Sequence, residues 1–242
     1  MIYFMGDIHG NFDRVIDAVQ RDRPDAIVLL GDMECDRPLH LILASIKDIT
    51  EIWWIPGNHD VDRPEFWANL VESDLANRNL QGRVQQVAGV KVAGLGGVFR
   101  QEIWYPPHPA NFTTYSEFEK ARLPPRRPRA DQGEGGKRLK HQSSIFPDVY
   151  AGLMRQRADI LVTHEAPSCH PHGFATIDEL AKAMRVRTMF HGHQHDCLDY
   201  STWNRQQGID AFGVGLRGIT NQDGGVVVPG EIDAVRHCRE GK

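Results

Sequence analysis

Short apolar runs alternate with helical patterns over the first 70 residues, and this alternation restricts the fold more than any other feature of the chain. The apolar runs cover residues 2–5, 26–30 and 52–55. After the first run, with Asn11 as a candidate N-cap, apolar residues recur at the i, i+3, i+4 and i+7 positions of one helical face. These residues are Phe12, Val15, Ile16 and Val19. Apolar strands that alternate with amphipathic helices predict an α/β fold with helices packed on a sheet.

The pattern changes near residue 84. Strands expected at 84–87 and 90–93 flank Gly89 and predict a hairpin that leads into a second sheet. Thr176 followed by Glu179 predicts a capping box at the start of a helix. Further strands are expected at 160–163, 187–190, 209–214 and 225–228.

Length and composition favour one globular domain. The 242 residues suffice for one large α/β domain and are too few for two, so a single domain is expected over residues 1–242. No apolar stretch approaches the ~20 residues that cross a membrane, and the run before Gly6 lacks the features of a signal peptide. The four cysteines form no C-x-x-C pair and are expected to be reduced thiols. We therefore expect a cytoplasmic protein that does not associate with membranes.

An insert at about 100–145 has no periodicity and is rich in proline and glycine. Between Lys120 and Lys140 it contains eight Lys or Arg residues against Asp131 and Glu134, in a protein whose net charge is −4. Such a segment is either a solvated loop or a lid that brings guanidinium groups to a phosphate-rich substrate, and we hold the two interpretations equal. A nucleic acid is a further candidate partner, although no aromatic residues interleave the basic ones.

Five short polar motifs fall at the ends of predicted strands, where α/β folds place their sites. They are Gly6-Asp7-Ile8-His9-Gly10, Gly31-Asp32, Gly57-Asn58-His59-Asp60, Thr163-His164 and Gly192-His193-Gln194-His195. Asp7 and His9 are two positions apart, so both point to the same side of an extended backbone. Asp32 has two oxygens with which to bridge two cations. This mixture of oxygen and imidazole donors suits Mn²⁺, Fe or Zn²⁺ better than Ca²⁺.

The ordered set of motifs resembles the calcineurin-like metallophosphoesterase superfamily, which uses D-x-H, GD, GNH followed by Asp or Glu, a lone His, and GH-x-H. The resemblance spans residues 6–195. It implies two mixed β-sheets packed as a sandwich and flanked by helices, in four layers, with a di-metal centre at one edge. It also implies two divalent ions, Mn²⁺ first and Fe or Zn²⁺ as alternatives. The implied ligands are Asp7, His9 and His195 for one ion, Asn58, His164 and His193 for the other, and Asp32 as the bridge.

The same resemblance implies roles for two further residues. His59 would lie over the phosphoryl group and protonate the leaving oxygen, and Asp60 would fix the orientation of its ring. A water held between the two ions would attack phosphorus, so no protein nucleophile is expected. The second motif differs from that of the protein serine/threonine phosphatases, which is GD-x-x-D-R-G. This chain has one residue more between Asp32 and Asp36-Arg37, and it has Pro38 in place of the final Gly. Arg37 is therefore not assigned to the phosphate.

The expected function is a metal-dependent phosphomonoesterase that acts on a phosphorylated small molecule, a nucleotide or a phosphoprotein. The alternative is a phosphodiesterase or nuclease that uses the same metal site. A non-catalytic binding scaffold is a third hypothesis, but it predicts lost ligands, and every expected position is filled. His170 and His172 are interpreted as loop residues, and a supporting role for His191 is left open. Oligomeric state is not indicated by the sequence.

Overall fold

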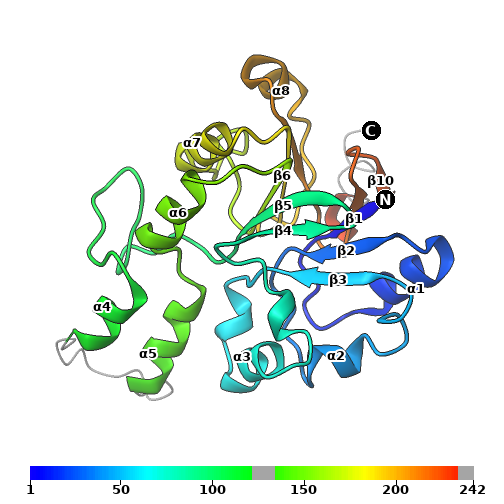
Figure 1. Ribbon diagram of the computed structural model, residues 1–242, viewed down its shortest axis with the longest axis horizontal. Helices are drawn as coiled ribbons and strands as arrows, with labels where there is room; N and C mark the ends of the chain where they lie inside the picture. Colours follow the sequence, from blue (N-terminus) through cyan, green and yellow to red (C-terminus); the bar gives the residue numbers. More distant parts are fainter. Residues whose placement is uncertain (122–133, 234–242) are drawn as a thin grey trace.

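Two five-stranded sheets face each other in the computed structural model, which describes residues 1–121 and 134–233 (Figure 1). The first sheet has the order β10-β9-β1-β2-β3 and the second the order β4-β5-β6-β7-β8. The strands of the first are β1 (Ile2–Met5), β2 (Ala26–Leu29), β3 (Glu51–Trp54), β9 (Ile219–Asn221) and β10 (Val226–Val228). The strands of the second are β4 (Val84–Val87), β5 (Val90–Leu95), β6 (Ile160–Thr163), β7 (Thr188–His191) and β8 (Asp210–Gly213).

Both sheets are mixed, as the sequence predicts. β1, β2 and β3 run parallel, while β9 pairs antiparallel with β1 and β10. In the second sheet β5 to β8 run parallel and β4 is antiparallel to β5. The parallel strands of each sheet therefore end at one common edge, where loops from several strands meet.

The space between the sheets is filled by alternate residues of their strands. Ile2 and Phe4 point into this layer, whereas Tyr3 and Met5 point to the outer face of the same sheet. The ring of Phe4 stacks on that of Phe190 from β7, with the ring centroids 3.8 Å apart. Because both faces of the first sheet are covered at its centre, the strands β1 and β2 are apolar throughout and do not alternate with polar residues.

Helices cover the two outer faces and complete the four expected layers. The core of the first face includes residues of α1 (Asp13–Asp22), α2 (Leu39–Ile42) and α3 (Pro64–Val71). The core of the second includes residues of α6 (Pro147–Met154), α7 (Ala175–Met184) and α8 (Ser201–Gln207). In the described ranges, no helix is long and apolar enough to cross a membrane.

Two helix starts differ from prediction. Phe12, and not Asn11, is the N-cap of α1, and the Asn11 side chain accepts a hydrogen bond from the Asp13 amide. Thr176 lies inside α7, which has Phe174 as its N-cap and begins at Ala175, two residues earlier than a cap at Thr176 predicts. The Phe174 amide donates to the Ala166 carbonyl and directs the chain into the helix. The Thr-x-x-Glu spacing alone does not fix a helix start.

The insert is more regular than predicted. It contains α4 (Tyr115–Lys120), α5 (Glu134–Lys140) and the 3₁₀ turn η3 (His141–Ser143). A capping box formed by Thr114 and Glu117 opens α4. Ile103, Phe118 and Phe146 form a small apolar core of their own. This core joins parts of the insert that are far apart in the sequence, which explains why no helical periodicity predicts it. Most of the basic run, residues 122–133, lies outside the described residues.

We expect Phe190→Ala to lower the free energy of unfolding by about 3–5 kcal/mol, because it leaves a cavity between the sheets where the ring is fully buried. Denaturant unfolding measures this. The control is Val226→Ala, at a strand position that is 54% exposed, with an expected change of about 0.5 kcal/mol or less. A cost below about 1 kcal/mol for Phe190→Ala would contradict the assigned core.

Candidate metal centre

The predicted ligands come from five parallel strands of both sheets and meet at one edge of the sandwich. Each lies in the loop that follows its strand: β1, β2 and β3 of the first sheet, β6 and β7 of the second. Among the described residues, two groups have ligand atoms that all lie within 4.8 Å of one another. They are Asp7, His9, Asp32 and His195, and Asp32, His164 and His193. Asp32 belongs to both groups.

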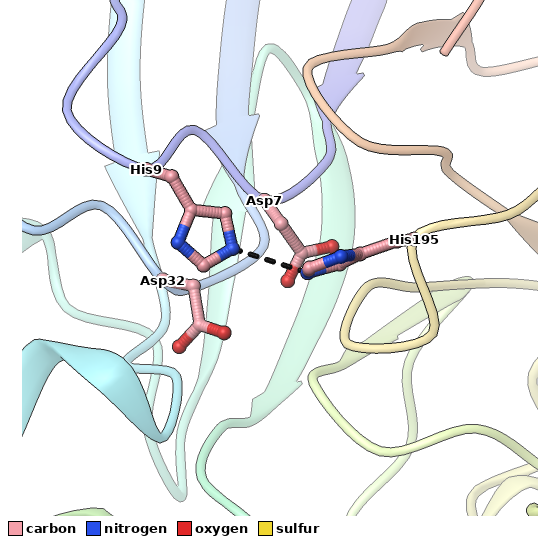
Figure 2. Close-up of side chains that lie close together, drawn as sticks. All are labelled: Asp7, His9, Asp32 and His195. Carbon is pink, nitrogen blue, oxygen red and sulfur yellow. Dashed lines mark hydrogen bonds between the residues drawn. The ribbon is translucent and has the colours of Figure 1, made fainter. Parts of the chain in front are cut away.

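Figure 2 shows the first group. The rings of His9 and His195 are turned toward each other, with Nε2 of one 3.1 Å from Nε2 of the other. Nδ1 of His9 lies 2.5 Å from Oε1 of Glu34. The Glu34 carboxylate accepts a hydrogen bond from Nδ1 and thereby orients the ring so that Nε2 of His9 is the nitrogen available to a metal.

Asp7 is buried and ties the loops of the two sheets together. Both of its carboxylate oxygens accept the backbone N–H of His193 at 2.9 Å. Burial raises the pKa of Asp7, and the neighbouring charge of Asp32 acts in the same direction. A cation at this position would reverse that effect by favouring the carboxylate.

One oxygen of Asp32 has an ion-pair neighbour, Nε2 of His164, but accepts no hydrogen bond from the described residues. Oδ1 accepts the backbone N–H of His59 at 2.7 Å. Oδ2 is buried, and no residue in the described part of the chain donates a hydrogen bond to it. A buried carboxylate oxygen without a donor is costly, and a divalent cation would supply the missing positive charge. The donor set therefore fits the divalent metal ions that the sequence predicts.

His164 faces the same point from the second sheet. Its Nδ1 donates to the Leu30 carbonyl at 2.8 Å, so its Nε2 is directed toward Oδ1 of Asn58 at 3.1 Å and Oδ2 of Asp32 at 3.4 Å. Burial disfavours the charged ring, but the carboxylate of Asp32 outweighs it and raises the pKa of His164 to about 10. In turn, His164 overcomes the burial of Asp32 and holds the pKa of that carboxyl well below its usual range. Without metal, a proton therefore occupies the nitrogen that a metal would bind.

The loops that carry these residues are held in left-handed backbone conformations. Positive φ angles occur at several non-glycine residues of the site, where they are sterically unfavourable. They include His9 (44°), Asp32 (49°), Glu34 (48°), His193 (68°) and His195 (61°). Gly57 is required for a different reason, because a Cβ there would collide with the backbone and carboxylate of Asp32.

Asp60 does not orient the ring of His59, and that expectation is wrong. Its Oδ1 accepts the amides of Met33 and Glu34 at 2.7 and 3.0 Å, and its Oδ2 accepts the Gly57 amide at 2.8 Å. It therefore fastens together the loops that carry Asp32 and Asn58. Burial, together with the charge of Asp32, raises the pKa of Asp60 to about 6, against the effect of these amides.

Asp62 is the partner of the His59 ring, with Oδ2 2.6 Å from Nδ1. His59 opens the 3₁₀ turn η1 (His59–Val61), in which residues three apart lie on the same side while the next residue points elsewhere. The ring is partly exposed, with 43% of the side chain accessible. Burial lowers the pKa of His59, but Asp62, Asp32 and Glu34 outweigh it and raise that pKa.

Arg217 and His191 contact the loops that carry the candidate ligands or lie directly before them. Arg217 donates to the carbonyls of Ile8 and His9 at 3.0 and 3.2 Å and contacts Glu231. His191 is fully buried, with its Nε2 3.1 Å from the Tyr200 hydroxyl, and burial lowers its pKa to about 4. Neither role follows from the motifs, since Arg217 reaches His9 across 208 residues.

The comparisons with known proteins agree with this arrangement. The family model for calcineurin-like phosphoesterases matches residues 1–197, so the chain belongs to this family. An uncharacterized protein of Haemophilus influenzae is 35% identical over 230 residues, covering 93% of this chain and 95% of the relative. The structure of TT1561 from Thermus thermophilus shares the fold, with a TM-score of 0.55, 15% identity and coverage of 95% and 97%. The family hydrolyses phosphate esters with divalent metals, and this chain is a metal-dependent phosphoesterase.

Metal affinity should rise with pH. The pKa of His164 is raised to about 10 in the metal-free protein, so the ring carries a proton at neutral pH that metal binding must displace. Between pH 6 and 9 the affinity for Mn²⁺ should therefore increase by about tenfold per pH unit for each proton released. Calorimetry in buffers of different ionisation enthalpy measures both the affinity for Mn²⁺ and the number of protons released. Binding that neither changes with pH nor releases protons would contradict this assignment.

Asp60→Asn should destabilise the protein by about 1–3 kcal/mol, because the amide group would place N–H donors against backbone donors that the carboxylate now accepts. The loops of Asp32 and Asn58 would separate, so Mn²⁺ binding should weaken as well. Thermal unfolding and calorimetry measure the two effects. The matched control is Asp62→Asn, which changes only the partner of the His59 ring and should keep both properties. Equal effects of the two substitutions would contradict the assignment.

Proposed function

We propose that this chain is a phosphomonoesterase with two divalent ions. One ion would be held by Asp7, His9 and His195, the other by Asn58, His164 and His193, with Asp32 between them. The observation that carries the proposal is the position of Asp32, which belongs to both ligand groups and has a buried oxygen without a hydrogen-bond donor among the described residues. When bound, the ions would supply the charge that activates an attacking water and neutralises the phosphoryl oxygens.

Manganese is the first choice of metal. The proposed ligands are carboxylates, imidazoles and one amide oxygen, without a thiolate, which favours Mn²⁺ and leaves Fe and Zn²⁺ as alternatives.

The cysteines Cys35, Cys169 and Cys197 are free thiols, which supports a reducing compartment and hence the cytoplasm.

His59 is proposed as the acid that protonates the leaving oxygen. Its Nδ1 is engaged by Asp62, so Nε2 is the nitrogen that would give up a proton. The surrounding carboxylates raise the pKa of His59 above its ordinary value against the effect of burial, which favours the protonated ring that an acid requires. Its partly exposed ring lies edge-on to His9, with the ring centroids 5.4 Å apart, so it is accessible to a substrate at the metal ligands.

The substrate is proposed to be a phosphate monoester of a small molecule, a nucleotide or a protein. The purified protein loaded with Mn²⁺ would be assayed with p-nitrophenyl phosphate, its bis ester, nucleotides and short RNA and DNA. Faster hydrolysis of the monoesters is expected. Preferred cleavage of the bis ester or of the strands would replace this proposal with a phosphodiesterase or nuclease.

Two substitutions should separate metal binding from proton transfer. Asp32→Asn should lose both turnover and bound Mn²⁺, because it removes a charge shared by both ligand groups. His59→Ala should keep the metal and lower turnover by about 10²–10⁴-fold, the usual contribution of a general acid. Metal content is measured alongside the steady-state rates. If His59→Ala loses metal as Asp32→Asn does, its proposed role is wrong.

A further inference from the structure

Arg100 lies at the point where the insert begins, directly after Phe99, whose amide contacts Glu165 in the loop that follows His164. It follows β5 and is half-buried. Its Nη1 donates to the Ser143 carbonyl at 2.7 Å and to the hydroxyls of Ser143 and Ser144 at 3.3 and 3.1 Å. Three contacts to one nitrogen hold the guanidinium in a fixed position.

The charge of Arg100 has no counter-ion in the described structure. Over residues 1–121 and 134–233 no carboxylate lies within ion-pair distance of its guanidinium, although the residue is half-buried. Its partners are neutral oxygens, all reached through Nη1, and a guanidinium has five N–H donors. A half-buried cation without a counter-ion gains free energy when an anion binds.

Two contacts fasten the Arg100 segment to the proposed catalytic groups. On one side the Phe99 amide donates to Oε1 of Glu165 at 3.0 Å, and Oε2 of Glu165 lies 4.0 Å from Nε2 of His193. On the other side η3, which carries Ser143, packs against η1, which carries His59.

The electrostatic surroundings of Arg100 agree with this placement. Burial lowers the pKa of Arg100, and the carboxylates of Glu102, Glu165, Asp32 and Asp62 act against that effect. Asp32 is a candidate metal ligand and Asp62 contacts the His59 ring, so the charge of Arg100 interacts with carboxylates of the proposed site.

We propose that Arg100 binds the phosphoryl group of the substrate and favours the dianion of a monoester over the monoanion of a diester. This inference rests on the proposed function and adds to it the group that distinguishes the two substrate classes. A monoester carries one more negative charge on its phosphoryl oxygens than a diester, and an unpaired guanidinium stabilises that additional charge. Because Ser143 and Ser144 already fix Arg100, little ordering is needed when phosphate binds.

A purely structural role predicts something different. If Arg100 served only to hold η3, its removal would lower the melting temperature and leave the affinity for phosphate unchanged in the folded protein. Arg100→Gln separates the two roles, because the glutamine amide is a neutral donor that can replace the bond to the Ser143 carbonyl.

The test measures binding of inorganic phosphate to the Mn²⁺-loaded protein by calorimetry, together with kcat/KM for p-nitrophenyl phosphate and its bis ester. Arg100→Ala and Arg100→Gln should each weaken phosphate binding by about 10- to 100-fold, the usual effect of losing a hydrogen bond to a charged group. The monoester-to-diester ratio of kcat/KM should fall by about the same factor, while bound Mn²⁺ stays constant. Added guanidinium should partly restore monoester turnover in Arg100→Ala.

Arg155→Ala is the matched control, because Arg155 is exposed and its removal changes the net charge equally. If Arg100→Ala unfolds, Arg100→Gln alone decides. Wild-type phosphate affinity in the folded, metal-loaded Arg100→Gln variant would overturn the inference, as would a wild-type protein that binds no phosphate. A wild-type protein that binds phosphate through Arg100 but hydrolyses neither ester would instead refute the proposed function.

Discussion

The concentration of buried negative charge around Asp32 is the constraint on which the rest of the site depends. Asp32 belongs to both groups of candidate ligands, and one of its oxygens receives no hydrogen bond from the described residues. Without metal the charge is compensated by a proton on His164, whose pKa is raised to about 10. A pair of divalent ions would compensate it more completely and would couple folding of the loops to metal binding.

Bringing these ligands together requires backbone conformations that are unfavourable in isolation. His9, Asp32 and Glu34 adopt positive φ angles, and surrounding hydrogen bonds hold them there. Asp60 accepts three backbone amides from two ligand loops, and Arg217 holds the carbonyl of His9. The strained segments are thus stabilised by residues that are not themselves ligands.

The insert extends the site beyond the metal ligands. Its start supplies Arg100, and its 3₁₀ turn η3 both fixes that residue and contacts the turn of His59. Arg100 would contribute to the choice of substrate, and the same insert contacts the turn that carries His59, the proposed acid. The core of Ile103, Phe118 and Phe146 packs the described parts of the insert against one another.

Much of the architecture and the ligand types could be predicted because they depend on local patterns. Apolar runs determined the strands, and polar motifs at strand ends identified Asp7, Asp32 and His164 as ligand candidates. The partner of His59 could not be predicted, since a 3₁₀ turn directs Asp62 and not Asp60 to the ring. The contacts of Glu34 with the His9 ring and of Arg217 with the His9 carbonyl were also missed. The sequence by itself determined which residues are candidate metal ligands. Only the tertiary structure decided which contacts hold and surround them, because those contacts join segments far apart in the chain.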